Sequence, residues 1–415
     1  MKKFVSLIIT VLFTVTLSTS AFAESAGFKD ESTVINAGTP YDKSYVEIRF
    51  STGESETAGV PLAYKEFLLS PAGNRIDKID GNTGETLISA ELSEKVSESL
   101  GGAITNGVLY QPARTTVFAV ELENMSVKCS RQFGEIITDI AAIDGLIYFG
   151  VRNNDGYSFI CADAEKNLEK VWEYKSENAI TSAGLFGEYI VFASGNKLIC
   201  HSKTDDDFKE NEIAGTITNV YAGKYAVFMT AEGGTLYKVR LEADGTVEDG
   251  SLMSLEIGGE LSAPAEKENK LFVSSTNGFY AVDALNMDVI KAYPDLKNGC
   301  DPVITTGSGF RAYVAAPVPS EGKWYLYSVL DNDDVLTLSE IVKINDFTNG
   351  KISVSDSGVM YFRDAKGHIY ALGIRENDIF TIILKIVIFI AIMVFLFLIL
   401  RAWIKKHSDK TPKFT

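Results

Sequence analysis

The feature that most constrains the fold is an internal repeat. Eight six-residue segments with alternating apolar side chains start 38 to 46 residues apart along most of the chain. They are RIDKID (75–80), TVFAVE (116–121), SFICAD (158–163), KLICHS (197–202), TLYKVR (235–240), GFYAVD (278–283), WYLYSV (324–329) and HIYALG (368–373). A repeat of this length is one supersecondary unit, and alternation with period 2 makes that unit a β-sheet.

Each repeat contains the other strands of a small antiparallel sheet. A second apolar run precedes each segment, as in EFLLSP (66–71) and KLFVSS (270–275), and turn residues such as Gly195-Asn196 separate the two as in a hairpin. We expect a short first strand at ITDI (137–140) and at its counterparts ITSA, ITNV and LSAP. A fourth strand can follow the first seven units, for example at DVIKAY (288–293).

The ends of the repeat array predict a closed ring. The eighth unit stops at Gly373 without a fourth strand, while the N-terminal segment SYVEIRF (44–50) is a strand without a hairpin of its own. If Tyr45–Phe50 forms the outer strand of the last unit, the circle closes and leaves no open seam. The prediction is an all-β, eight-bladed β-propeller of four-stranded antiparallel blades, with seven blades as the alternative.

The two termini predict a membrane-anchored protein. Residues 1–23 have the basic start, apolar middle and Ala21-Phe22-Ala23 cleavage site of a signal peptide. Residues 379–400 form an apolar run long enough for a transmembrane helix, joined to the propeller by the short linker 374–378. Lys385 is expected to reach the outer headgroups from within this run.

The basic tail 401–415 is expected to stay inside the cell. The prediction is therefore a single-pass type I protein of the cell membrane, with an extracytoplasmic propeller at residues 24–373.

The charge of the chain excludes one class of partner. The formal net charge is −16, and it becomes −22 for residues 24–377 once the basic contributions of the two ends are set aside. A domain this acidic repels nucleic acid, so no nucleic-acid partner is expected.

The repeats resemble the PQQ-like, quinoprotein-type β-propeller, in particular its membrane-anchored bacterial surface proteins. The resemblance rests on the period, on strands such as FYAVD (279–283) and IYALG (369–373), and on DGNTGE (80–85), which is similar to the family's A-x-D-x-x-T-G-x-x-x-W motif. Enzymes of this family hold pyrroloquinoline quinone (PQQ) with calcium, and many carry a disulfide between adjacent cysteines. The resemblance implies the fold more strongly than the function.

The residues that such an enzyme needs are mostly missing. There is no Cys-Cys pair, and the T-G motif ends in Leu87-Ile88 where the family has tryptophan. Of the tryptophans, Trp172 holds the family's position between blades, and Trp324 is expected in an inner strand. Ile88, Tyr174 and Tyr293 are expected to fill the other blade-packing positions. We therefore predict no cofactor.

No other catalytic or metal-binding motif is present in the sequence. His201, His368 and His407 have no metal-ligand spacing, and a T-G turn explains DGNTGE without calcium. The acidic runs DDD (205–207) and DNDD (331–334) are interpreted as solvated loop tips. Cys161 and Cys200 replace alanines of sister repeats and are interpreted as unpaired packing residues.

Three functions remain open. The leading hypothesis is a non-catalytic surface scaffold that binds a protein or a cell-envelope polymer. The alternatives are a quinoprotein-like oxidoreductase, or another enzyme that uses the propeller channel, and a carbohydrate-binding module. For the leading hypothesis, no catalytic, cofactor or metal residues are assigned.

Overall fold

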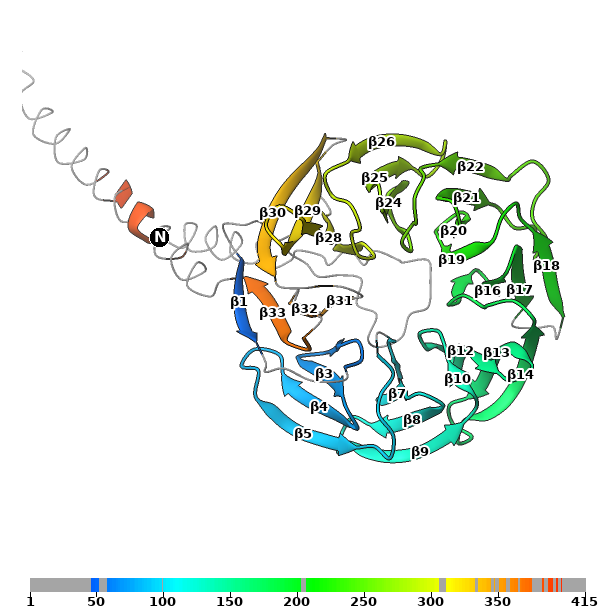
Figure 1. Cartoon of the computed structure of the whole chain (residues 1–415). Coiled ribbons are helices and arrows are strands. Elements are labelled where there is room, and N and C mark those ends of the chain that lie inside the picture. The colour runs from blue at the N-terminus through cyan, green and yellow to red at the C-terminus, as the bar shows by residue number, and fades with distance from the viewer. Residues whose placement is uncertain are drawn as a thin grey trace, which may run out of the picture.

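The computed structural model confirms an eight-bladed β-propeller (Figure 1). It describes residues 46–51 and 58–374, apart from 99, 203–206, 306–310, 333–334, 345–346, 348–350, 356–358 and 365, and a few residues between 383 and 397. The described strands form eight antiparallel sheets arranged in a ring, so the seven-bladed alternative is wrong.

The first four blades follow one another along the chain. Blade 1 contains β2 (Leu62–Tyr64), β3 (Phe67–Ala72), β4 (Arg75–Asp80) and β5 (Thr86–Glu91). Blade 2 contains β6 (Ala103–Thr105), β7 (Val108–Pro112), β8 (Thr116–Glu121) and β9 (Ser126–Gln132). Blade 3 contains β10 (Glu135–Ile136), β11 (Ala141–Ile143), β12 (Leu146–Asn153), β13 (Gly156–Asp163) and β14 (Glu169–Ser176). Blade 4 contains β15 (Gly184–Phe186), β16 (Tyr189–Ser194), β17 (Lys197–Ser202) and β18 (Phe208–Glu212).

The last four blades complete the ring. Blade 5 contains β19 (Ile217–Ala222), β20 (Val227–Ala231), β21 (Thr235–Val239) and β22 (Met253–Glu256). Blade 6 contains β23 (Ala265–Lys267), β24 (Lys270–Ser275), β25 (Gly278–Asp283) and β26 (Asp288–Tyr293). Blade 7 contains β27 (Val303–Thr305), β28 (Arg311–Val318), β29 (Lys323–Asn332) and β30 (Val335–Ile344). Blade 8 contains β31 (Ile352–Val354), β32 (Met360–Arg363), β33 (Ile369–Ile374) and, from the other end of the chain, β1 (Val46–Ser51).

The N-terminal strand closes the ring as predicted. β1 pairs antiparallel with β33, from Val46 opposite Ile374 to Ser51 opposite Tyr370. The strand is one residue further along than the predicted 45–50. Blade 8 is thus built from both ends of the propeller sequence, and no blade in the described chain lacks an outer strand.

Side-chain contacts fasten blade 8 to blade 1. The buried Arg363 donates from Nη2 to Ser70 Oγ at 2.8 Å, and the Tyr361 hydroxyl donates to the carbonyl of Gly81 at 3.2 Å. The backbone N–H of Ala63 donates to Ser353 Oγ at 3.0 Å. Hydrogen bonds and packing therefore join the two blades at the point where the ring closes.

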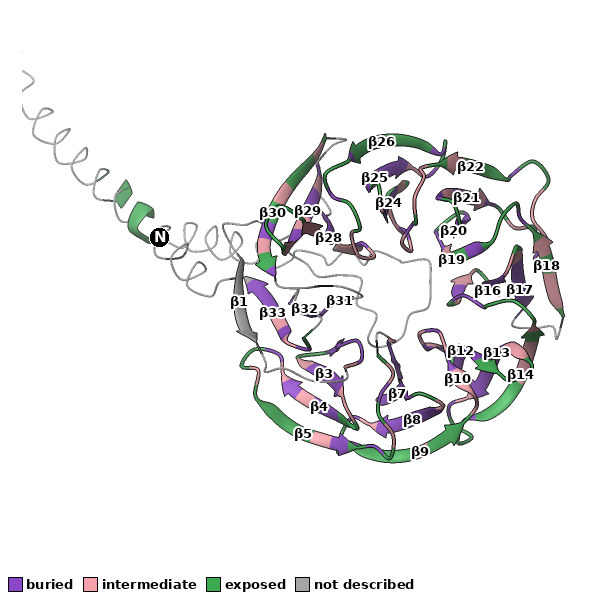
Figure 2. Cartoon of the chain, viewed as in Figure 1, coloured by how far each residue is buried: buried purple, intermediate pink, exposed green. Residues whose placement is uncertain are grey.

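The hydrophobic core lies between blades rather than at the centre of the ring. Eight clusters of buried residues among the described ones each join two neighbouring blades, including one that joins blades 8 and 1. Figure 2 shows the same arrangement, with buried residues on the middle strands and exposed ones on the outer strands. Because each sheet buries both faces, its middle strands are almost continuously apolar.

The first strands differ from the prediction. In blades 3, 4 and 6 the regular strand begins after ITDI, ITSA and LSAP, whereas ITNV lies within β19. In these three segments a Thr or Ser hydroxyl accepts a backbone N–H of the neighbouring strand, in place of a backbone carbonyl of the strand ladder. The N–H of Gly150 donates to Thr138 Oγ1, that of Ala193 to Thr181 Oγ1 and that of Ser274 to Ser262 Oγ, all at 2.8–3.0 Å. A side-chain acceptor competing with the backbone interrupts the strand there.

In the part of the C-terminal segment that the structure describes, no helix is both long and apolar enough to cross a bilayer. The signal peptide, the tail and most of the predicted span at 379–400, including Lys385, lie outside the described residues.

Candidate functional site

The DGNTGE sequence makes a turn between two strands. One carboxylate oxygen of Asp80 accepts the N–H groups of Asn82 and Thr83, both at 2.9 Å, and the chain then turns through Gly84 at φ +77° into β5. Asp163 and Asp283 hold the same position in blades 3 and 6 and each accept two N–H groups in the same way. The motif is therefore needed for chain reversal, whether or not a ligand is bound.

Trp172 lies between blades 3 and 4, as the family pattern predicted. It extends from β14, and its ring contacts Tyr148 at 5.9 Å, Phe208 at 5.4 Å and His201 at 4.4 Å between centroids. His201 is thus part of an aromatic interblade cluster. Tyr174 and Tyr293 also pack in interblade clusters, but Ile88 remains 40% exposed, so its predicted packing role is wrong.

Four polar residues lie at the inner ends of blades 3, 7 and 8, around the centre of the ring, and are called the channel residues: Asp139, Cys300, Asp301 and Lys351. Cys300 holds the place in blade 7 that Thr138 holds in blade 3: its Sγ accepts the N–H of Ala315 at 3.2 Å. The residue after each is an aspartate, Asp301 and Asp139. Since the two positions are equivalent in their repeats, both carboxylates belong to the same ring of positions around the channel.

Lys351, which precedes β31, reaches across this ring. Its ammonium donates to Oδ2 of Asp139, which lies 212 residues away in blade 3, and Oδ1 of Asp139 accepts the N–H of Gly101 at 2.7 Å. Oδ1 of Asp301 accepts the N–H of Ala263 at 3.1 Å. Asp139 therefore links blades 2, 3 and 8, and Asp301 links blades 6 and 7.

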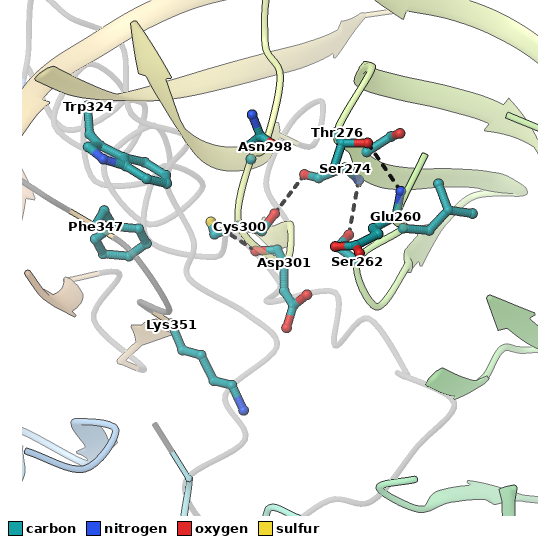
Figure 3. Close-up of a pocket in the computed structure, with 13 residues that line it drawn as sticks. Glu260, Ser262, Ser274, Thr276, Asn298, Cys300, Asp301, Trp324, Phe347 and Lys351 are labelled. Atoms are coloured by element: carbon teal, nitrogen blue, oxygen red, sulfur yellow. Dashed lines mark hydrogen bonds between the residues drawn. The ribbon is translucent and has the colours of Figure 1, made fainter. Parts of the chain in front are cut away.

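A cavity of about 640 Å³ opens beside this group of charges (Figure 3). Trp324 and Phe347 lie next to each other on one side of it, and Glu260, Ser262 and Thr276 lie on the other. Asp301 and Lys351 line it below them in the view. Trp324 is on β29, the third strand of its blade rather than an inner one, yet it reaches the cavity.

The electrostatics of the cavity are set by burial and by the opposing charges. Burial raises the pKa of Asp301, and the field of Lys351 and the N–H of Ala263 offset this only in part. Burial lowers the pKa of Lys351, but the carboxylates of Asp139 and Asp301 outweigh that effect and raise it. Burial also raises the pKa of Cys300 to about 12, so its thiol stays protonated at neutral pH.

The other candidate catalytic or metal-binding side chains, His368 and the cysteines, lie in turns or in packed parts of the blades. Nδ1 of His368 lies 2.9 Å from Oδ2 of Asp364, whose other oxygen accepts the N–H groups of Lys366 and His368 at the β32–β33 turn. Cys161 and Cys200 are buried and unpaired, as predicted, and Cys129 and Cys300 are also free. Among the described residues no group of three potential ligands is placed to hold a metal ion.

One acidic run was misinterpreted. The side chain of Asp331 is only 5% exposed and forms a 2.7 Å ion pair with Lys270 of blade 6. The first residue of the DNDD run is therefore buried and is not part of a solvated loop tip. Asp207, by contrast, is 83% exposed. The other residues of DDD, and residues 333–334, lie outside the described part of the chain.

The channel residues Asp139, Cys300, Asp301 and Lys351 were not identified from the sequence. A signal was available, because ITDI in blade 3 and CDPV in blade 7 (300–303) carry an aspartate just before the first strand. Nothing in the repeat pattern marked Lys351, because its partner Asp139 is in a blade far away along the chain.

The comparisons with known proteins show the fold. No protein-family model and no curated protein matches the chain. Among solved structures, quinohemoprotein alcohol dehydrogenase from Comamonas testosteroni is 10% identical, with a TM-score of 0.57 over 84% of this chain and 81% of that one. Dihydro-heme d1 dehydrogenase NirN is also 10% identical, with a TM-score of 0.57 over 80% of this chain and 78% of that one. BamB from Moraxella catarrhalis is 13% identical, with a TM-score of 0.48 over 77% and 82%.

The cavity does not fit the cofactor that a quinoprotein would need. PQQ carries three carboxylates, which need cationic partners, and it is bound together with calcium. The described lining offers one cation, Lys351, which is already paired with Asp139, and it places the carboxylates of Glu260 and Asp301 nearby. Among the described residues no group of three acidic, histidine or cysteine side chains is placed to hold the calcium ion, so a tricarboxylate would meet net repulsion there.

The ring of four-stranded blades, its closure by β1 and the structural similarity to the quinohemoprotein alcohol dehydrogenase together show the fold of this chain: an eight-bladed β-propeller similar to those of quinoprotein dehydrogenases.

Proposed function

We propose that the protein is a membrane-anchored, non-catalytic propeller that binds a protein partner or a cell-envelope polymer. The observation that carries this proposal is the state of the channel groups. Asp139 and Lys351 bond to each other, and Cys300 is a protonated thiol bonded to backbone groups. Catalysis by a nucleophile needs an activating base within hydrogen-bond reach, and the described cavity lining contains no such pair.

The anchor is supported by sequence and by the described C-terminal residues. Between 383 and 397, the described residues are helical and apolar, and their side chains are exposed, as with Phe389 at 65%. Apolar helical side chains without a protein neighbour are costly in water and stable in a bilayer. We therefore propose a single-pass protein with its propeller outside the cytoplasm.

A protein partner is favoured by the outer surface of the ring. Leu87 and Ile88 on β5 and Val289 and Ile290 on β26 are each 40% exposed or more, and among the described strands none pairs with the outer edge of β5 or β26. Exposed apolar side chains at a sheet edge are suited to pairing with another chain.

Site-specific photo-crosslinking in intact cells tests the docking role. A photoreactive amino acid at position 88 or 289 is expected to give a discrete adduct of one mass, whereas the same group at the exposed, charged position Lys175 gives none. Absence of a discrete adduct at every outer-strand position would count against a protein partner and favour the envelope polymer.

The rival oxidoreductase function is tested by cofactor binding. Titration of the purified full chain with PQQ and calcium, followed by calorimetry and absorbance, is expected to give no heat beyond dilution. A stoichiometric complex of micromolar affinity would replace the scaffold proposal with an enzyme.

A further inference from the structure

The channel cavity has the dimensions of a small-molecule site. Its volume of about 640 Å³ falls within the roughly 300–1,000 Å³ of typical ligand pockets. It is lined by polar and aromatic side chains from blades 6, 7 and 8 and from the segments before their first strands (Figure 3). Docking of a partner on the outer strands makes no use of this space.

The charges of the lining disfavour an anionic ligand. Glu260 and Asp301 outnumber Lys351, whose charge Asp139 already offsets, so the lining repels an anion. A ligand without net charge avoids this repulsion, and its polar groups can still bond to either sign of charge.

The hydrogen-bonding capacity of the lining matches hydroxyl groups. Asp301 uses Oδ1 for the N–H of Ala263, and no described residue donates to its Oδ2. The ammonium of Lys351 has three donors, of which one bonds to Asp139. A hydroxyl both donates and accepts, so adjacent hydroxyls can donate to Asp301 and accept from Lys351.

Aromatic rings form the wall beside these groups. The centroids of Trp324 and Phe347 lie 6.1 Å apart with their planes at 60°, and both rings line the cavity. Aromatic side chains provide a large, rigid apolar surface. A pyranose ring has hydroxyls at its rim and C–H groups on its faces, so it is complementary to a wall of this kind beside polar groups.

We propose that this cavity binds one ring of a neutral sugar, with its hydroxyls toward Asp301 and Lys351 and a C–H face against Trp324. The site stands independently of the docking role proposed above, because different residues carry it. It also differs from quinone binding, which requires a site that attracts carboxylates.

Three sugars of matched shape test the charge argument. The full chain in phospholipid nanodiscs, which avoid sugar-headed detergents, is titrated with N-acetylglucosamine (neutral), glucosamine (cation) and glucuronate (anion), with glucose as a second neutral probe. Saturation-transfer NMR and calorimetry are expected to show saturable binding of a neutral sugar, at least tenfold tighter than of glucuronate. No saturable binding of either neutral sugar, or tighter binding of a charged one, would overturn the proposal.

Substitutions locate the site. Asp301→Asn keeps the side-chain shape and an acceptor for Ala263, and it is expected to weaken neutral-sugar binding at least tenfold. Lys351→Met and Trp324→Leu are expected to weaken it as well. Asp163→Asn, at the β13–β14 turn, is the control and should bind as the wild type does. If Trp324→Leu fails to fold, Asp301→Asn decides, since unchanged affinity in that variant would place the sugar elsewhere.

Discussion

At the scale of single residues, buried charges stabilise contacts between blades. Lys270 and Asp331 form an ion pair with side chains 14% and 5% exposed, and Arg363 is buried at the closure between blades 8 and 1. Burial lowers the pKa of Arg363 to about 10, which leaves it charged at neutral pH. An unpaired charge at such a position is expensive, so each partner depends on the other.

Removing one member of the Lys270–Asp331 pair should destabilise the protein strongly. Asp331→Ala removes the buried carboxylate that pairs with the Lys270 ammonium and is expected to lower the free energy of unfolding by about 3–5 kcal/mol. Replacing both residues, with Lys270→Met and Asp331→Leu, should cost clearly less. Chemical denaturation measures both. The exposed pair Arg240–Glu248 is the control and should contribute less than about 1 kcal/mol. Equal losses in the single and double variants would contradict this account.

Asp80 gives a prediction for acid stability. The N–H groups of Thr83 and Asn82 lower its pKa below the ordinary 3.8, so its contribution to stability is present above pH 4 and is lost as the pH falls through the lowered value. The stability difference between wild type and Asp80→Asn should therefore shrink in that acid range. Urea midpoints at several pH values measure it, and a difference that grows on acidification would show that the sign is wrong.

At the scale of elements, β1 is the strand on which closure depends. It covers the outer edge of β33, and the two strands are more than 300 residues apart in the chain. Because its partner is the last strand of the propeller to be synthesised, closure is the contact of longest range in the fold.

Deletion of residues 24–51 should expose the edge of β33. We expect a large loss of thermal stability, or aggregation, because an unpaired edge invites pairing with other chains. Deletion of residues 24–44 retains β1 and serves as the matched control, with an expected melting temperature close to that of the wild type. Equal melting temperatures for both deletions would show that β1 contributes little to the ring.

Strand identity could be predicted from the sequence better than strand limits and contacts. The third strands carry alternating apolar residues, and several end in an aspartate turn, so RIDKID, TVFAVE and GFYAVD match β4, β8 and β25 residue for residue. The predicted first strands began too early. Where a side-chain hydroxyl such as that of Thr138 accepts a backbone N–H in place of a carbonyl, the strand is interrupted, and the hydrophobic periodicity of the sequence does not reveal this. Burial of Asp331 depends on Lys270 in another blade, which local patterns do not reveal.

At the scale of the whole molecule, the proposed anchor and the ring predict how the protein is exposed. Protease added to intact cells should remove the propeller and spare an epitope placed after Thr415, because the short basic tail is expected inside the cell. Immunoblotting against both ends measures this. Protection of the propeller in intact cells, with digestion only after lysis, would contradict the outside-facing topology.

The position of β33 between β1 and β32 also has a mechanical consequence. The chain leaves the ring from the end of β33, and the ladder hydrogen bonds on both sides of this strand run perpendicular to it. A force along the strand axis therefore loads two rows of bonds in shear, so that many must break together instead of one after another. The blade that joins the two ends of the propeller is thus built to resist being pulled out of the ring by the proposed C-terminal anchor.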